Sequence, residues 1–277
     1  MLKPRAFALV VIVALLVSAC APRSLSTQPS PTTQVKPAGT LNVFAAASLT
    51  ASFNEIGKAF ESKNPGVKIT YNFAGSQQLA QQINSGAPAD VFASANQAQM
   101  DAVMKNDRIA SSASKVFVNN RLVVVYPKAN PGKIQSLQDL ARPGLKLVMA
   151  DKAVPVGQYA LNFLDNAAKD TNFSASYKES VLHNVASYEQ DVKSVLTKVM
   201  LGEADAGIVY TTDATSDREG KTTQLAIPDN LNVIAAYPIA VLKDSSNPKL
   251  AQDFVDYILS DEGQAVLSKY GFIPVSQ

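Results

Sequence analysis

The stretch LNVFAAASLTASFNEIGKAF, residues 41–60, contains the folding pattern of this chain in its shortest form. Residues 41–47 are uncharged and mostly apolar, which is typical of a strand buried on both faces. Apolar side chains then recur at helical spacing through residues 49–60, so an amphipathic helix follows the strand. Ser48 stands at the junction between the two. A buried strand that leads directly into an amphipathic helix predicts one β-α unit of an α/β protein.

The same β-α unit recurs along the rest of the chain. Repeated units of this kind indicate mixed, mostly parallel sheets with helices on both faces. We predict strands over 41–47, 67–73, 90–94, 121–127, 146–150, 206–210 and 235–242, and helices over 49–60, 77–84, 97–105, 157–169, 192–200, 250–259 and 262–270.

The β-α units fall into two series, which predicts two lobes. Long strands near residues 123–126 and 237–242 connect the series, so we expect the chain to cross twice between the lobes. The first lobe is predicted from residues 40–122 and 237–277, and the second from residues 123–236, including a crossover strand. The cleft between the lobes is the expected ligand site.

Residues 1–20 have the features of a secretory signal, with a basic start, an uncharged apolar run over 6–17 and small residues before Cys20. The run is too short for a membrane span. Cys20 is the single cysteine, so no disulfide is expected within the chain. Its place resembles that of the cysteine in a bacterial lipobox, which implies a lipid on Cys20 and an extracytoplasmic protein anchored to the cell membrane. Residues 21–39, dominated by Pro, Ser and Thr, predict a tether.

The charge balance excludes some classes of partner. Loss of Lys3 and Arg5 with the signal lowers the 25 basic residues to 23, equal to the 23 acidic ones. The sequence has no basic stripe, so no nucleic-acid partner is expected. A neutral chain also has no global field to attract an anion, so any anion must be held by local dipoles.

Two serines occupy the same predicted structural position. Ser48 and Ser76 each end a strand and begin a helix. Taken singly, each is explained as a helix N-cap, because serine is among the preferred N-cap residues. Taken together, they place hydroxyls and backbone N–H groups at positive helix ends, on the edge of the sheet where α/β proteins bind ligands. The pair therefore predicts an anion site.

Short motifs spread over residues 40–277 form a specific combination. They read FAAASLT (44–50), FAGS (73–76), LAQQI (79–83), GAPADVF (86–92), VPVGQYA (154–160), DV (191–192), GIVY (207–210) and KYGF (269–272). In these motifs the chain resembles the periplasmic molybdate-binding proteins, which have the two-lobe periplasmic-binding-protein fold. The resemblance implies a monomer that binds molybdate or tungstate and works with the permease and ATPase subunits of an ABC importer. It implies no enzyme activity and no cofactor.

Matched position by position, the resemblance implies five ligand contacts. Ser48 and Ser76 would donate from hydroxyl and backbone, Val156 and Val192 from their backbone N–H groups, and Tyr210 from its phenol. Molybdenum would enter only as its oxyanion, without a direct protein ligand. Molybdate is a fully deprotonated dianion at neutral pH, so a suitable site offers donors alone, and these groups do so. Tungstate has nearly the same size and charge, whereas sulfate is smaller.

A serine-dependent hydrolase is the main alternative from another class. It would need a base near Ser48 or Ser76, and the single histidine, His183, has no nucleophile or orienting partner beside it in the sequence. We therefore expect a structural role for His183. The acidic residues at loop and helix starts have no metal-ligand spacing, so capping or surface roles are expected for them. These are Asp90, Asp151, Asp191 and Asp213.

Other ligands of the same architecture are further alternatives. A sulfate binder would use similar donors, and phosphate, which carries a proton at neutral pH, would favour an acceptor carboxylate. An Fe(III) site would need clustered tyrosines and carboxylates, which Tyr210 alone does not supply. None of the five matched positions is acidic, so the sequence favours a tetrahedral dianion.

Overall fold

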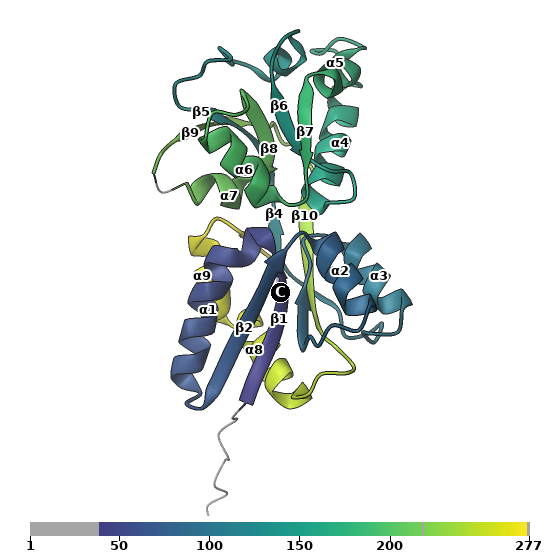
Figure 1. Cartoon of the computed structure of the whole chain (residues 1–277), viewed down its shortest axis with the longest axis vertical. Coiled ribbons are helices and arrows are strands. Elements are labelled where there is room, and N and C mark those ends of the chain that lie inside the picture. Colours follow the sequence, from purple (N-terminus) through teal and green to yellow (C-terminus); the bar gives the residue numbers. More distant parts are fainter. Residues whose placement is uncertain (1–38, 218, 276–277) are drawn as a thin grey trace, which may run out of the picture. The chain divides into compact units, whose positions relative to one another are not determined.

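Two β-sheets organise residues 39–217 and 219–275, the part of the chain that this computed structural model describes (Figure 1). Sheet 1 has the strand order β11-β4-β10-β3-β1-β2, and sheet 2 has the order β7-β6-β8-β5-β9. The strands of sheet 1 are β1 (Gly39–Ala46), β2 (Val67–Ala74), β3 (Val91–Ala93), β4 (Lys115–Asn120), β10 (Ala235–Val241) and β11 (Ile273–Pro274). Those of sheet 2 are β5 (Leu122–Pro127), β6 (Leu147–Ala150), β7 (Val185–Glu189), β8 (Ala206–Tyr210) and β9 (Thr222–Ala226).

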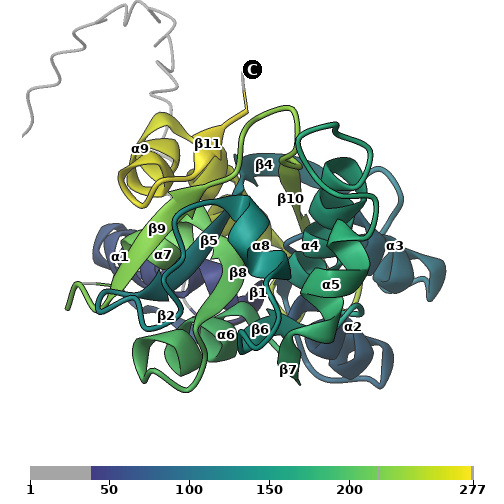
Figure 2. The same cartoon turned by 90° about the horizontal axis from the view of Figure 1, so that it is seen from above.

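Helices cover both faces of each sheet (Figures 1 and 2). In sheet 1, α1 and α2 lie on opposite faces, and in sheet 2, α4 and α6 do so, as expected when successive β-α units wind in opposite directions from a central strand. The helices are η1 (Ala47–Leu49), α1 (Thr50–Lys63), α2 (Ser76–Asn84), α3 (Gln97–Lys105), η2 (Leu137–Ala141), α4 (Pro155–Ala167), α5 (Tyr177–His183), α6 (Val192–Met200), α7 (Thr211–Thr215), α8 (Pro248–Leu259) and α9 (Asp261–Lys269). None of the helices within the described residues has the length and hydropathy needed to cross a membrane.

The α/β class with mixed sheets is confirmed, but the expectation of mostly parallel pairing is wrong. β1 pairs in parallel with β2 and β3, and β6 pairs in parallel with β7 and β8. β10 is antiparallel to β3 and β4, and β5 is antiparallel to β8 and β9. The reason is that the chain crosses between the two sheets. β10 and β5 each arrive from the other sheet and begin at the edge where the parallel strands have their carboxyl ends, so they run in the opposite direction.

The chain passes between the sheets at two points. Arg121 alone separates β4 of sheet 1 from β5 of sheet 2, and residues 227–234 lead from β9 back to β10. These positions lie within a few residues of the crossovers expected near 123–126 and 237–242. The exact lobe boundaries stay a prediction.

All the predicted strands and helices are present, with ends shifted by a few residues, but several elements were missed. β7 and β9 are the two edge strands of sheet 2, and their residues are intermediate or exposed throughout. Edge strands pack on fewer neighbours, so their hydrophobic pattern is weak. The other elements without a prediction are β4, β11, α5, α7 and η2.

Candidate functional site

Ser48 and Ser76 lie at the same edge of sheet 1. β1 and β2 end level with each other, because Ala46 pairs with Ala74 in the parallel register. Ser48 follows in η1 and Ser76 is the first residue of α2, and both side chains are buried. The two hydroxyls therefore belong to adjacent strand-to-helix junctions, as the sequence predicts.

Neither serine is a helix cap, so that explanation is wrong. The Ser48 Oγ lies 2.9 Å from the phenol oxygen of Tyr237 in β10. The Ser76 Oγ accepts a hydrogen bond of 3.0 Å from the backbone N–H of Ala95. The N-cap of α2 is Gly75, and no side chain caps η1, α1 or α2. Because the first N–H groups of a helix have no partner inside it, these junctions keep donors that no side chain caps.

The other three predicted residues lie at the corresponding edge of sheet 2. Val156 is the second residue of α4, Val192 is the first residue of α6, and Tyr210 ends β8. The side chains of both valines are buried in the hydrophobic core, so only their backbone N–H groups are available for a ligand. The Asp191 side chain accepts from the Ser194 N–H, two residues beyond Val192.

Short contacts connect the two edges. Gln77 Nε2 in α2 donates to the carbonyl of Gln190, just before α6, at 2.8 Å. Asn96 Nδ2, at the start of α3, donates to Gln158 Oε1 in α4 at 3.1 Å. Gly75 is so close to this boundary that an added Cβ would lie 2.4 Å from the Gln190 carbonyl oxygen. The helix starts that carry the predicted donors therefore face one another across the two sheets.

Tyr210 and Tyr237 join the two edges at their centre. Their ring centroids are 5.7 Å apart, and Tyr237 in turn contacts Ser48. The Tyr210 hydroxyl is buried close to the Tyr237 hydroxyl, but it forms no hydrogen bond of normal geometry among the described residues. Burial raises the pKa of Tyr210 well above its usual range, helped by the neighbouring Tyr237 and Tyr159. Tyr210 is therefore a neutral phenol that keeps its proton, and a buried hydroxyl without a well-formed hydrogen bond costs about 1–3 kcal/mol.

The bacterial extracellular solute-binding protein family matches residues 41–273 of the chain. The chain belongs to this family. One relative is the molybdate-binding protein ModA of Mycobacterium tuberculosis (strain ATCC 25618 / H37Rv), 41% identical over 92% of this chain and 91% of that protein.

Solved structures share the fold of this solute-binding protein. A substrate-binding domain from Clostridium difficile, assigned to a molybdenum ABC transporter, gives a TM-score of 0.63 at 30% identity over 86% of this chain and 99% of that chain. The periplasmic molybdate-binding protein of Azotobacter vinelandii gives a TM-score of 0.72 at 18% identity over 86% of this chain and all of that chain. At this lower identity, the likeness concerns the fold.

Sequence reasoning missed two polar residues of this solute-binding protein: Tyr237, which contacts Ser48, and Asn120, which contacts Tyr237. Asn120 ends β4 and is fully buried, and its Nδ2 lies 2.9 Å from Thr212 Oγ1 and 3.3 Å from the Tyr237 oxygen. Tyr237 is also fully buried. Local spacing contains no signal for these contacts, because Tyr237 is 189 residues from Ser48 and 117 from Asn120.

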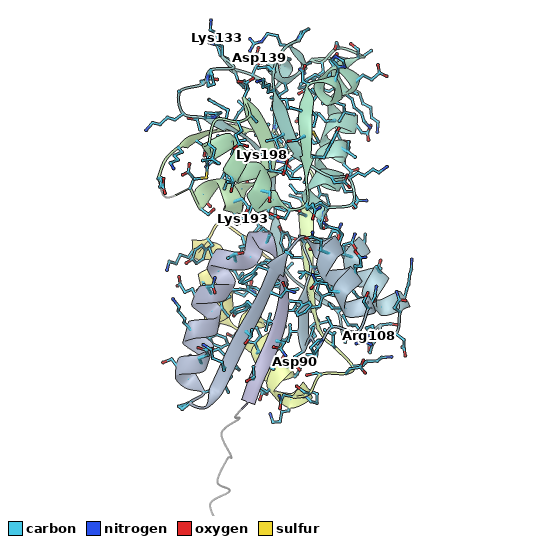
Figure 3. All side chains as sticks on the ribbon, viewed as in Figure 1. Asp90, Arg108, Lys133, Asp139, Lys193 and Lys198 are labelled. Carbon is cyan, nitrogen blue, oxygen red and sulfur yellow. The ribbon has the colours of Figure 1, made fainter. Side chains whose placement is uncertain are left out.

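The expected capping or surface role holds for Asp191 and Asp151 but is wrong for Asp90 and Asp213, which are buried. Asp191 caps α6, Asp151 accepts from the Ala153 N–H, and Asp90 accepts from the Asn42 N–H. Asp213 is fully buried and forms an ion pair of 2.8 Å with Lys193 of α6, the helix on which Figure 3 labels Lys193. Burial raises the pKa of Asp213, and the Lys193 ammonium opposes this shift. Residues 39–217 and 219–275 contain no cluster of three or more His, Cys, Asp or Glu that could hold a metal ion.

The position of His183 does not fit a catalytic role with Ser48 or Ser76. It is the last residue of α5 and is exposed, whereas Ser48 and Ser76 are buried. The hydrogen bonds of the serine hydroxyls involve the Tyr237 phenol and the Ala95 amide, neither of which is a base.

A groove of about 490 Å³ lies beside the donor set. Ala47 and Thr50 line it from sheet 1, and residues of α6 including Lys193 line it from sheet 2. Its lining contains none of the five predicted ligand residues, so we regard it as adjacent to the candidate site.

Proposed function

We propose that this solute-binding protein captures molybdate, and tungstate, as a tetrahedral dianion outside the cytoplasm. The buried Tyr210 hydroxyl carries the proposal, because it is a neutral donor that forms no well-aligned hydrogen bond among the described residues and lies beside Tyr237, which contacts Ser48. Ser48, Ser76, Val156 and Val192 would supply the remaining donors. The name of the Mycobacterium tuberculosis relative supports molybdate as the ligand.

The energetics are sufficient for tight binding. About seven charge-assisted hydrogen bonds at roughly 1.5–3 kcal/mol each give roughly 10–20 kcal/mol before ordering and desolvation are subtracted. The remainder is compatible with a Kd from micromolar to nanomolar. Neutral dipoles hold the charge, so the size of the site would separate molybdate and tungstate from the smaller sulfate.

The cellular role follows from the ligand and the family. We propose delivery of the anion to the permease and ATPase subunits of an ABC importer by a monomer, which a lipid on Cys20 holds at the cell membrane. Cys20 and the tether lie outside the described residues. The extracellular family description supports a location outside the cytoplasm.

The proposal is tested by calorimetric titration of residues 40–277 with molybdate, tungstate, sulfate and phosphate. We expect tight binding of the first two anions. Sulfate should bind at least ~100-fold more weakly, a difference of about 2.7 kcal/mol. Equal binding of sulfate and molybdate would show that the proposed ligand is wrong.

A further inference from the structure

We propose that Asn120 and Tyr237 form a hydrogen-bond relay that fixes Ser48 as a donor toward the bound anion. The inference rests on the proposed function and deepens it, because it assigns two positioning residues. The relay runs from the end of β4 through β10 to η1, and all three side chains are buried.

The orientation of the Asn120 carboxamide sets the direction of the relay. Its Oδ1 accepts the backbone N–H of Arg121 at 2.9 Å. A backbone N–H only donates, so the carboxamide oxygen must face Arg121 and the NH₂ group must face the other way. The two NH₂ protons then point to Thr212 Oγ1 and to the Tyr237 oxygen, at 2.9 and 3.3 Å.

The proton of Tyr237 has one destination. Burial raises the pKa of this phenol, so it keeps its single proton at neutral pH. Its oxygen accepts from Asn120, and the neighbouring Tyr210 hydroxyl, although close to it, forms no hydrogen bond of normal geometry among the described residues. The remaining neighbour is the Ser48 Oγ, 2.9 Å away. Tyr237 therefore donates to Ser48.

Ser48 then accepts from Tyr237 and keeps its own proton to donate. Because Tyr237 supplies the proton between the two oxygens, the Ser48 proton is directed away from Tyr237, toward the anion. The relay thus provides a donor to the ligand without placing a charge in the site.

A double-mutant cycle tests the relay with molybdate at pH 8. In Asn120→Asp the carboxylate only accepts, so the Tyr237 proton should turn to it and the Ser48 proton should turn to Tyr237. We expect molybdate to bind at least 10-fold more weakly, the effect of losing one donor to a charged group. Tyr237→Phe should weaken binding by at most about threefold, because Ser48 keeps its proton.

The double variant separates the relay from simple charge repulsion. Removal of the Tyr237 hydroxyl in the Asn120→Asp background returns the Ser48 proton to the anion, so affinity should recover about 10-fold relative to Asn120→Asp alone. Repulsion by a buried carboxylate would persist in the double variant. Absence of recovery, or a Tyr237→Phe loss as large as that of Asn120→Asp, would overturn the relay.

Matched controls measure the effect of the same substitutions elsewhere. Asn184 is a buried asparagine whose Nδ2 donates to the carbonyls of Leu140 and Arg142, and Tyr177 is a buried tyrosine that donates to the Leu137 carbonyl. Asn184→Asp and Tyr177→Phe should lower the melting temperature and leave molybdate affinity unchanged. If wild type binds sulfate but not molybdate, the proposed ligand is wrong, and the same cycle in sulfate decides the relay. Failure to bind any oxyanion would overturn both proposals.

Discussion

At the scale of the residue, Tyr210 has a buried hydroxyl that forms no well-aligned hydrogen bond among the described residues. Tyr210→Phe keeps the ring contacts with Tyr237 and Tyr159 and removes only the hydroxyl. Because that hydroxyl forms no well-aligned hydrogen bond among the described residues, the melting temperature of the ligand-free protein should change little. Molybdate binding should weaken by roughly 1.5–3 kcal/mol, measured by calorimetry.

Tyr177→Phe is the matched control for this change, with the opposite expected pattern. The Tyr177 hydroxyl donates to the Leu137 carbonyl at 2.6 Å, so its loss should cost stability by about 1 kcal/mol and leave binding intact. Unchanged molybdate affinity in Tyr210→Phe would remove Tyr210 from the proposed site.

At the scale of the element, an ion pair connects the start of α6 to α7. Lys193 follows Val192, and its ammonium pairs with the fully buried Asp213, three residues after Tyr210. The pair connects α6, which begins with Val192, to α7, which directly follows Tyr210. Lys193→Met would leave the Asp213 carboxylate without its cation.

We expect Lys193→Met to make stability depend on pH. Burial raises the pKa of Asp213 in the folded protein, and without Lys193 nothing comparable opposes the shift. Between the unfolded pKa of about 3.9 and the raised folded pKa, the folded protein binds more protons than the unfolded chain, so the free energy of unfolding falls as pH rises. Urea unfolding should show a loss of about 2–3 kcal/mol at pH 8, discounted because Lys193 is 32% exposed, and a smaller loss at pH 4–5.

Lys198→Met provides the comparison within the same helix. Lys198 pairs with Glu189, which is 14% exposed in contrast to the fully buried Asp213. Its removal should cost less and change little with pH. An equal pH dependence in both variants would show that the burial of Asp213 is not the cause.

At the scale of the whole molecule, the proposed membrane anchor depends on one residue. Full-length protein should partition with membranes, and Cys20→Ala should not, because a single cysteine would carry the lipid. Fractionation of cells that express each form, followed by immunoblotting, measures the distribution. Equal membrane fractions for both forms would refute the lipid anchor and leave the binding proposal unaffected.

Local sequence determined the elements and the chemistry of their ends. Strand and helix periods are properties of neighbouring residues, so the β-α units around residues 41–60 and 67–84 follow from the order of apolar and polar side chains. The positions of Ser48, Ser76 and Tyr210 at strand ends follow from the same pattern. The roles of these residues toward a ligand came from the family resemblance and stay predictions.

Only the tertiary structure decided what the predicted side chains touch. Ser48 meets Tyr237, Ser76 meets the Ala95 amide, and Lys193 meets Asp213, through contacts that no local spacing indicates. The antiparallel course of the crossover strands was decided in the same way, because it depends on the end at which a strand enters its sheet. Periodicity shows which face of an element is buried. The identity of a buried polar partner depends on how distant elements pack, because most buried donors and acceptors find their partners only in three dimensions.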